Sequence, residues 1–204
     1  MIEDHKAHWE HIYQHKQPYE VSWTQEKPHL SLQLIHQYHP EKDAAIIDVG
    51  GGDSRLVDYL LDEGFTNLTV LDISESAIHR ARVRLGEKAN SVHWIVCDIR
   101  DFKPDTIYNI WHDRAAFHFL THEKDLETYI QVIEKAVSGH LVIGTFSVDG
   151  PKKCSGLEIS QYDEQKMTVL FETAQFQKED CLREDHITPA GATQNFVFCT
   201  FFKK

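Results

Sequence analysis

The sequence predicts an α/β protein whose mostly parallel sheet is built from strands that alternate with helices. Residues 46–54 read IIDVGGGDS, an apolar run that ends in an acid, followed by three glycines and a polar residue that can start a helix. A second apolar run, residues 68–71, also ends in an acid, Asp72. This strand–glycine loop–helix–strand–acid order is typical of a nucleotide-type cofactor pocket. Helical and strand patterns then continue to alternate, which indicates right-handed crossovers.

The size and charge of the chain restrict its class. Its 204 residues, 41% hydrophobic and 26% charged, predict one globular domain, 1–204. A net charge of −11 provides no basic excess for binding nucleic acid. No run approaches the ~20 apolar residues of a membrane span, and the N-terminus lacks the apolar stretch of a signal peptide. We therefore expect a cytoplasmic protein without nucleic-acid or membrane partners.

The cysteines and histidines suggest no framework or metal site. Cys97, Cys154, Cys181 and Cys199 form no CxxC pair, so reduced thiols are favoured over a disulfide framework. The fourteen histidines are scattered and form no HExxH motif. No metal site is expected.

The first half of the chain yields its elements from local signals. Aromatic and histidine residues at helical spacing cover 5–17, and a helix is predicted over 28–39, so residues 1–40 form an N-terminal helical lid segment. A strand covers 44–49. Asp53 or Ser54 is predicted to cap the next helix, which closes at Gly64. A strand over 68–71 and a helix capped by Ser74 and ended by Gly86 follow.

The second half continues this pattern and ends differently. Strands are predicted over 92–97, 107–111 and 141–146, with a long helix that begins at Thr121 and extends to 137. Residues 151–160 read as a loop, and a short helix lies near 162–170. Two terminal strands, about 171–186 and 194–202, have no strong helix between them, so we expect an antiparallel hairpin at one edge.

Two cofactors compete for the glycine loop. A dinucleotide site requires GxGxxG, but the third glycine position is Arg55, and Asp53 at the mouth of the helix would repel a pyrophosphate. S-adenosylmethionine carries no phosphate and has a cationic sulfonium, so nearby acids are acceptable. Asp53 and Asp48 therefore favour the methyl donor.

Acids follow three successive strands, at Asp48, Asp72 and Asp98. Parallel strands end at the same sheet edge, so these carboxylates should share it. Asp72 is suited to accept hydrogen bonds from both ribose hydroxyls, and Asp98 from the adenine amino group. A lone acid often only caps a helix, but three at successive strand ends favour the cofactor interpretation.

Over residues 44–146 the chain resembles the class I S-adenosylmethionine-dependent methyltransferases, which have a Rossmann-like fold. The resemblance implies a three-layer, doubly wound sheet of seven strands, mostly parallel with an antiparallel last strand. It also places Ser54 where the family usually has its third glycine. The predicted cofactor-binding residues are Asp48, Gly50, Gly51, Gly52, Asp53, Ser54, Asp72, Ile73, Asp98 and Ile99.

The segment after the fourth strand, WHDRAAFHFL at 111–120, should face the transferred methyl group. It is similar to the thiopurine and related thiol methyltransferases, which carry an Asp-Arg pair there, and more broadly to the seven-strand protein lysine methyltransferases. His112, Asp113 and His118 are candidate catalytic residues. For His112 and Asp113 the alternative is a pair that fixes the loop, and for His118 it is core packing. The candidate substrate-binding residues are Trp23, Arg114, Phe119 and His186.

Two further features remain open. Trp9, Tyr13, Tyr19 and Trp23 form either a lid that excludes water from the cofactor or an ordinary packing helix. A weaker hypothesis has Cys154 and Cys199 meeting to handle a soft element.

The sequence thus predicts an S-adenosylmethionine-dependent methyltransferase acting on a small-molecule thiol or amine. A protein lysine methyltransferase, and a non-catalytic cofactor-binding module, remain alternatives. The sequence does not predict an oligomeric state.

Overall fold

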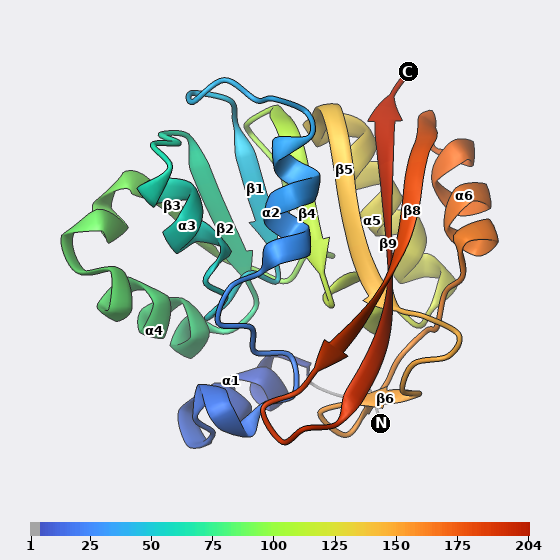
Figure 1. The fold of residues 1–204 in the computed structure, drawn as a ribbon. Helices are drawn as coiled ribbons and strands as arrows, with labels where there is room; N and C mark the ends of the chain where they lie inside the picture. The colour runs from blue at the N-terminus through green and yellow to red at the C-terminus, as the bar shows by residue number, and fades with distance from the viewer. Residues whose placement is uncertain (1–4) are drawn as a thin grey trace.

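The computed structural model describes residues 5–204 and has one seven-stranded sheet flanked by helices (Figure 1). The strand order is β3-β2-β1-β4-β5-β9-β8. Strands β1 to β5 pair in parallel, and β9 pairs antiparallel with both β5 and β8. The predicted fold class is confirmed. The strands are β1 Ile46–Val49, β2 Leu68–Asp72, β3 Val92–Val96, β4 Tyr108–Arg114, β5 Val137–Phe146, β8 Phe176–Ile187 and β9 Thr193–Lys203.

Six α-helices lie within the described residues, and none of them is long and apolar enough to cross a membrane. They are α1 His5–His15, α2 His29–His36, α3 Leu56–Asp62, α4 Glu75–Leu85, α5 Glu123–Ala136 and α6 Glu164–Thr173. The 3₁₀ helices are η1 Pro18–Glu20, η2 Gly86–Ser91 and η3 Phe117–Phe119. Residues 151–160, expected to be a loop, contain a small hairpin of β6 Lys153–Cys154 and β7 Leu157–Glu158.

Each face of the sheet has its own hydrophobic core. Helices α5 and α6 pack on one face, where Ile47 and Trp111 are buried. Helices α2 and α3 pack on the other, where Ile46 and Ile110 are buried. Neighbouring residues of one strand thus point to opposite faces. Because both faces are covered, the central strands read as continuous apolar runs in the sequence.

The helix caps were predicted with mixed success. Ser74 caps α4 by accepting a hydrogen bond from the Ala77 N–H at 3.1 Å, and Gly86, with φ +58°, ends it. Of the two residues predicted to cap α3, Ser54 accepts a hydrogen bond from the Leu56 N–H at 3.1 Å, although the helix is bounded by Arg55. The Asp53 carboxylate pairs with Arg84 instead, so long-range ion pairing overrides the local capping preference of Asp53.

Two boundaries in the second half also differ. Helix α5 begins after His122 and not after Thr121, and no side chain caps it. Strand β5 begins at Val137, directly after α5, and so is four residues longer at its start than the predicted 141–146. Pairing with β4 and β9 extends this strand beyond its apolar run.

The expectation for the cysteines is wrong for one pair. Cys181 and Cys199 are directly opposed in the β8–β9 ladder and form a disulfide, so Cys199 does not meet Cys154. Cys97 and Cys154 are free. The pairing depends on strand register, which the spacing of cysteines alone does not reveal.

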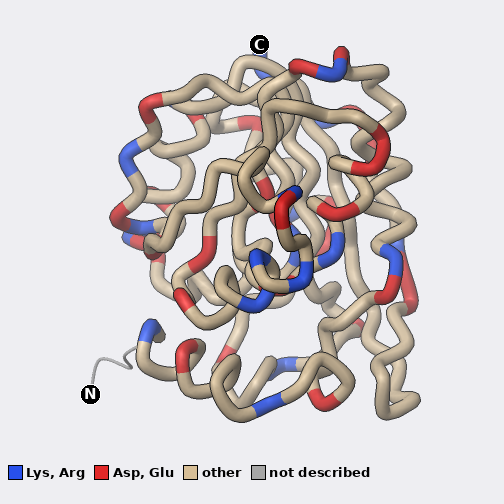
Figure 2. Tube along the Cα trace, turned by 90° about the vertical axis from the view of Figure 1, so that its left-hand side faces the viewer, with Lys and Arg blue, Asp and Glu red and all other residues tan. Residues whose placement is uncertain are grey.

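Charged residues of both signs occur along the described chain (Figure 2). In the side view of Figure 2, Lys and Arg are interspersed with Asp and Glu along the trace. Helix α1 lies beyond the carboxyl ends of the parallel strands and beside the tip of the β8–β9 hairpin (Figure 1). This end of the sheet is where the site is built.

Candidate active site

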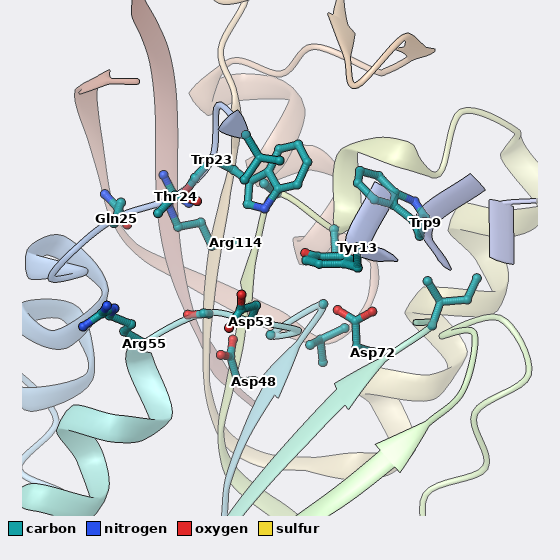
Figure 3. A pocket seen from close by; sticks show the side chains of 18 of the residues that line it. Trp9, Tyr13, Trp23, Thr24, Gln25, Asp48, Asp53, Arg55, Asp72 and Arg114 are labelled. Carbon is teal, nitrogen blue, oxygen red and sulfur yellow. The ribbon is translucent and has the colours of Figure 1, made fainter. Parts of the chain in front are cut away.

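A cavity of about 980 Å³ lies at the carboxyl ends of β1, β2 and β4, beneath α1 and the segment 17–28 (Figure 3). Most of the predicted site residues line it. The exceptions are Gly52, Asp113, His118 and His186. The predicted residues that do line it are Trp23, Asp48, Gly50, Gly51, Asp53, Ser54, Asp72, Ile73, Asp98, Ile99, His112, Arg114 and Phe119.

Close packing around the loop requires glycine, without a Cβ, at Gly50 and Gly52. A Cβ on Gly50, whose φ is +65°, would lie 2.5 Å from the Ala116 Cβ. A Cβ on Gly52 would lie 2.7 Å from Asp72 Oδ2. Gly52 therefore lets the Asp72 carboxylate come close to the loop, although Gly52 itself does not line the cavity. Only glycine leaves this approach open.

Asp48 is held by a hydrogen-bonded chain at the base of the cavity. Its Oδ1 lies 2.7 Å from His112 Nδ1, and the Nε2 of His112 lies 2.8 Å from the Ser31 hydroxyl. Both nitrogens of the His112 ring are thus engaged. The other Asp48 oxygen, Oδ2, is buried and has no hydrogen-bond partner among residues 5–204. An unpaired buried carboxylate oxygen beside a cavity is suited to a cationic or hydrogen-bond-donating ligand.

Asp72 points into the cavity below Tyr13 (Figure 3). Its Oδ1 accepts a hydrogen bond from the Ser74 N–H at 2.8 Å. Burial, together with the negative charges of Asp48 and Glu10, raises the pKa of Asp72 to about 7. A ligand that donates hydroxyl hydrogens would stabilise the ionised carboxylate and oppose this shift.

Asp98 and Asp53 are each neutralised by arginine. Burial acts to raise the pKa of Asp98, but the hydrogen bonds and charge of Arg100, 2.6 Å away, lower it overall. The Asp53 carboxylate bonds to Arg84, which also pairs with Asp58 at 2.9 Å. Asp53 therefore ties the glycine loop to α4.

Helix α1 closes the cavity through a polar contact and an aromatic cluster. Glu10 accepts hydrogen bonds from the Ser74 hydroxyl at 2.8 Å and the Ser76 N–H at 3.2 Å. Trp9 packs edge-on against Trp23 and Phe119, with ring centroids 5.5 and 5.1 Å apart. The sequence analysis missed Glu10 because its partners lie more than sixty residues away.

The structure does not place Asp113 where a catalytic group would act. Its carboxylate is fully buried and accepts hydrogen bonds from the N–H groups of Ala116 and Phe117 and from the Tyr129 hydroxyl, all within 3.1 Å. Burial raises its pKa to about 6. The alternation of side chains along β4 turns Asp113 to the face opposite His112. Asp113 fixes the turn after β4, but not as the pair with His112 that the loop-fixing alternative predicted, because His112 bonds to Asp48 and Ser31 instead.

His118 and His186 also lie outside the cavity lining. The His118 ring stacks on Phe146 at 4.7 Å, and its Nδ1 accepts a hydrogen bond from the Phe146 N–H at 3.3 Å. Burial and the charge of Arg114 lower its pKa to about 3, so the ring is neutral. His186 bonds to the Ser22 carbonyl at 2.7 Å and ties the hairpin tip to the lid segment. The expected acceptor contacts of both residues are corrected accordingly.

Arg114 and Cys154 form the side of the cavity away from β2 and β3. Arg114 Nη1 donates a hydrogen bond to the Trp23 carbonyl at 3.0 Å, and its guanidinium lies over the Phe196 ring at 4.8 Å. Burial lowers the pKa of Arg114 to about 10 and raises that of the Cys154 thiol to about 12. The sequence analysis did not assign Cys154 or Ser31 to the site, since both reach it only through tertiary contacts.

The fold and site together define a nucleoside-cofactor-binding protein of the open α/β type, with the pocket at the carboxyl ends of the strands. The donor set fits S-adenosylmethionine better than a dinucleotide. Three strand-end carboxylates, Asp48, Asp72 and Asp98, line the cavity, and the loop carries Asp53 where a pyrophosphate would need a free helix N-terminus. Among residues 5–204, no group of three or more His, Cys, Asp or Glu side chains is arranged to hold a metal ion.

The comparisons with known proteins agree with this class. Residues 46–138 match the family model described as "Methyltransferase domain". The mouse "eEF1A lysine and N-terminal methyltransferase" is 24% identical over 127 residues, which are 61% of this chain and 18% of that protein. The "Malonyl-[acyl-carrier protein] O-methyltransferase 2" of Ilyobacter polytropus is 27% identical over 105 residues, 51% of this chain and 40% of that protein. The matches thus span less than half of both relatives.

A solved structure matches nearly the whole chain. The 1,6-didemethyltoxoflavin-N1-methyltransferase of Burkholderia thailandensis, with 1,6-didemethyltoxoflavin and S-adenosylhomocysteine bound, has a TM-score of 0.69 at 19% identity. The match covers 95% of this chain and 81% of that one, and shows the shared fold. Residues 46–138 thus resemble a methyltransferase domain, and the chain shares its fold with an enzyme whose structure contains S-adenosylhomocysteine.

Proposed function

We propose that the protein transfers a methyl group from S-adenosylmethionine to a small-molecule acceptor. One observation carries the proposal: the strand-end carboxylates and the side chains of Trp23, Arg114 and Phe119 line the same covered cavity. Its volume of about 980 Å³ is at the top of the ~300–1,000 Å³ range of small-molecule pockets. That volume suits a nucleoside cofactor together with a compact acceptor.

Different residues of the cavity would bind different parts of the cofactor. When bound, S-adenosylmethionine supplies an activated methyl group on a cationic sulfur. Asp72 and Asp98 are placed to accept hydrogen bonds from the ribose and the adenine. The chain of Ser31 and His112 fixes Asp48, whose free Oδ2 faces the cationic end of the cofactor.

The cavity favours acceptors that arrive with a free lone pair. His112 is hydrogen-bonded at both ring nitrogens, and His118 lies outside the lining, so neither offers the cavity a free ring nitrogen for direct contact with an acceptor. In the transfer the acceptor's lone pair forms the new bond to the methyl carbon, and the electrons of the broken carbon–sulfur bond stay on sulfur. A thiolate or carboxylate needs no proton removal for this step, whereas an ammonium group does. Positioning is then the protein's main contribution.

Two alternatives have less support. A protein lysine acceptor is suggested by the mouse relative, which is named for lysine and N-terminal methylation. The cover formed by α1 and segment 17–28 disfavours an extended peptide, because the peptide would have to displace it. A non-catalytic binding module would need a cavity with no space for an acceptor.

The test is a transfer assay with methyl-labelled S-adenosylmethionine and a cell extract separated into small-molecule and protein fractions. We expect label in the small-molecule fraction, its loss in Asp72→Ala, and its retention in the exposed control Asp105→Ala. Label only in protein would establish the lysine alternative. Absence of label with intact S-adenosylhomocysteine binding would establish the non-catalytic module.

A further inference from the structure

We propose that the acceptor carries a carboxylate, or a planar anion of the same shape, and that Arg114 binds it through Nε and Nη2. The inference rests on the proposed function in one respect, that this side of the cavity is the acceptor site. Arg114 is thereby the residue that selects the acceptor, and the selected class is small organic acids.

The free edge of the guanidinium carries the argument. Arg114 Nε and Nη2 are both buried and have no hydrogen-bond partner among residues 5–204. These two N–H groups lie on the same side of the planar guanidinium and form the fork that matches the two oxygens of a carboxylate. Buried donors without partners are costly, so a ligand group that satisfies both is expected.

Arg114 differs from the other cations around the cavity. Four further arginines line it, and each forms an ion pair within the described chain: Arg55 with Glu26, Arg80 and Arg84 with Asp53, and Arg100 with Asp98. Within residues 5–204, Arg114 forms no ion pair within 4.0 Å. It is the cation at this cavity that is left to meet an anionic ligand.

The surroundings hold the guanidinium in place for such a ligand. Nη1 is anchored to the Trp23 carbonyl, and the plane rests on Phe196. Glu184 on β8 supplies the compensating negative charge, but its Oε2 is itself buried without a hydrogen-bond partner, and Glu184 does not line the cavity. The guanidinium is thus held in place, while its Nε and Nη2 form no hydrogen bond within residues 5–204.

The cofactor offers a second carboxylate, on its amino acid end. The position of Arg114 favours the acceptor instead. Strand β4 lies on the opposite side of β1 from β2 and β3, whose ends carry the proposed ribose and adenine acids. Arg114 faces the side formed by Cys154 and β9, and the experiment separates the two sources directly.

The first arm measures binding by calorimetry to the protein saturated with S-adenosylhomocysteine, with benzoate and benzamide as probes of equal shape. We expect benzoate to bind at least about tenfold tighter, as charge-assisted bidentate hydrogen bonds imply. Arg114→Gln should abolish the preference, and Arg114→Lys should reduce it because the fork is lost. The exposed control Arg82→Gln should keep it. Equal binding of benzoate and benzamide to the parent protein would overturn the proposal, and this comparison needs no variant to fold.

The second arm compares S-adenosylhomocysteine with 5′-methylthioadenosine, which lacks the amino acid end. We expect Arg114→Gln to leave the affinity for both within about twofold of the parent. A loss of affinity confined to S-adenosylhomocysteine would show that Arg114 holds the cofactor carboxylate, and would overturn the proposal. Because both arms measure binding, a benzoate preference without any methyl transfer would refute the proposed function and leave the anion site standing.

Discussion

The two halves of the cavity are built differently. The proposed cofactor half consists of the glycine loop and the acids at the ends of β1, β2 and β3. All of these residues come from one stretch of the chain, 46–98. The proposed acceptor half contains Trp23, Ser31, Arg114, Phe119 and Cys154, which come from the lid segment, α2, the end of β4, η3 and β6. The first is local in the sequence, whereas the second exists only once distant elements have packed together.

This difference has a chemical consequence. The proposed cofactor half is rich in carboxylates, three of which each bond to a backbone N–H group, a histidine or an arginine through at least one oxygen. The acceptor half is mainly apolar and carries one buried cation with unpaired donors. A shared cofactor can be bound by the first arrangement in many proteins, while the second can change with the acceptor. Four experiments would test this division.

The largest effect is expected behind the acceptor half, at Asp113. Asp113→Ala leaves three buried donors without an acceptor, and should lower the free energy of unfolding by about 3 kcal/mol. Tyr129→Phe removes one of those hydrogen bonds and should cost about 1 kcal/mol. Denaturant titration measures both. If Asp113→Ala kept normal stability but lost turnover, Asp113 would have a catalytic role and not only a structural one.

The next largest effect belongs to the cofactor half. Asp72→Ala should weaken S-adenosylhomocysteine binding by about 2–3 kcal/mol, because a carboxylate that accepts two hydroxyl hydrogen bonds is lost. Calorimetry measures it, with Asp105→Ala as the exposed control. Unchanged affinity, or tight binding of NADH by the parent, would remove Asp72 from the cofactor half.

The pH dependence of cofactor binding should expose the same carboxylate. Its pKa is raised to about 7 in the ligand-free protein, so the ionised form that accepts hydroxyl hydrogens increases from pH 6 to pH 8. Affinity for S-adenosylhomocysteine should rise about tenfold over that interval. The stability of the empty protein should change in the opposite sense. An acid whose folded pKa is raised favours folding below its unfolded pKa of about 4, and that contribution is lost as the pH rises through 7.

Asp72→Asn is the control for this titration, since it cannot ionise. Asp113, with a pKa raised to about 6, titrates in the same window but lies outside the cavity. A pH dependence that survives in Asp72→Asn would therefore assign the titration to another group.

The smallest effect concerns the cover shared by both halves. Glu10→Gln weakens the contact between α1 and the start of α4 by about 1 kcal/mol, and should speed amide exchange over residues 5–25. In the parent, S-adenosylhomocysteine should slow exchange in the same residues if the aromatic segment closes on the ligand. The exposed Glu127→Gln is the control. Identical exchange with and without ligand would leave Trp9 and Tyr13 as ordinary packing residues.

The sequence by itself determined the cofactor half and the order of the elements. The three glycines 50–52 follow β1 directly, and Asp48, Asp72 and Asp98 lie within two residues of the carboxyl ends of β1, β2 and β3. Such features depend on neighbours close in the chain, so patterns of apolar runs, glycines and acids are enough to reveal them. The turn of Asp113 away from His112 also follows from strand alternation, a signal that the sequence analysis did not use.

Tertiary structure alone decided the rest. The pairing of Cys181 with Cys199 depends on the register of β8 and β9, and the pairing of Asp53 with Arg84 depends on how α4 docks. The second ring nitrogen of His112 is engaged by Ser31, which lies eighty-one residues away. Arg114 has donors without partners because no carboxylate of residues 5–204 comes within hydrogen-bond reach of its Nε and Nη2. Long-range packing determines which buried polar groups find hydrogen-bond partners within the chain. The groups that find none are the ones left to bind a ligand.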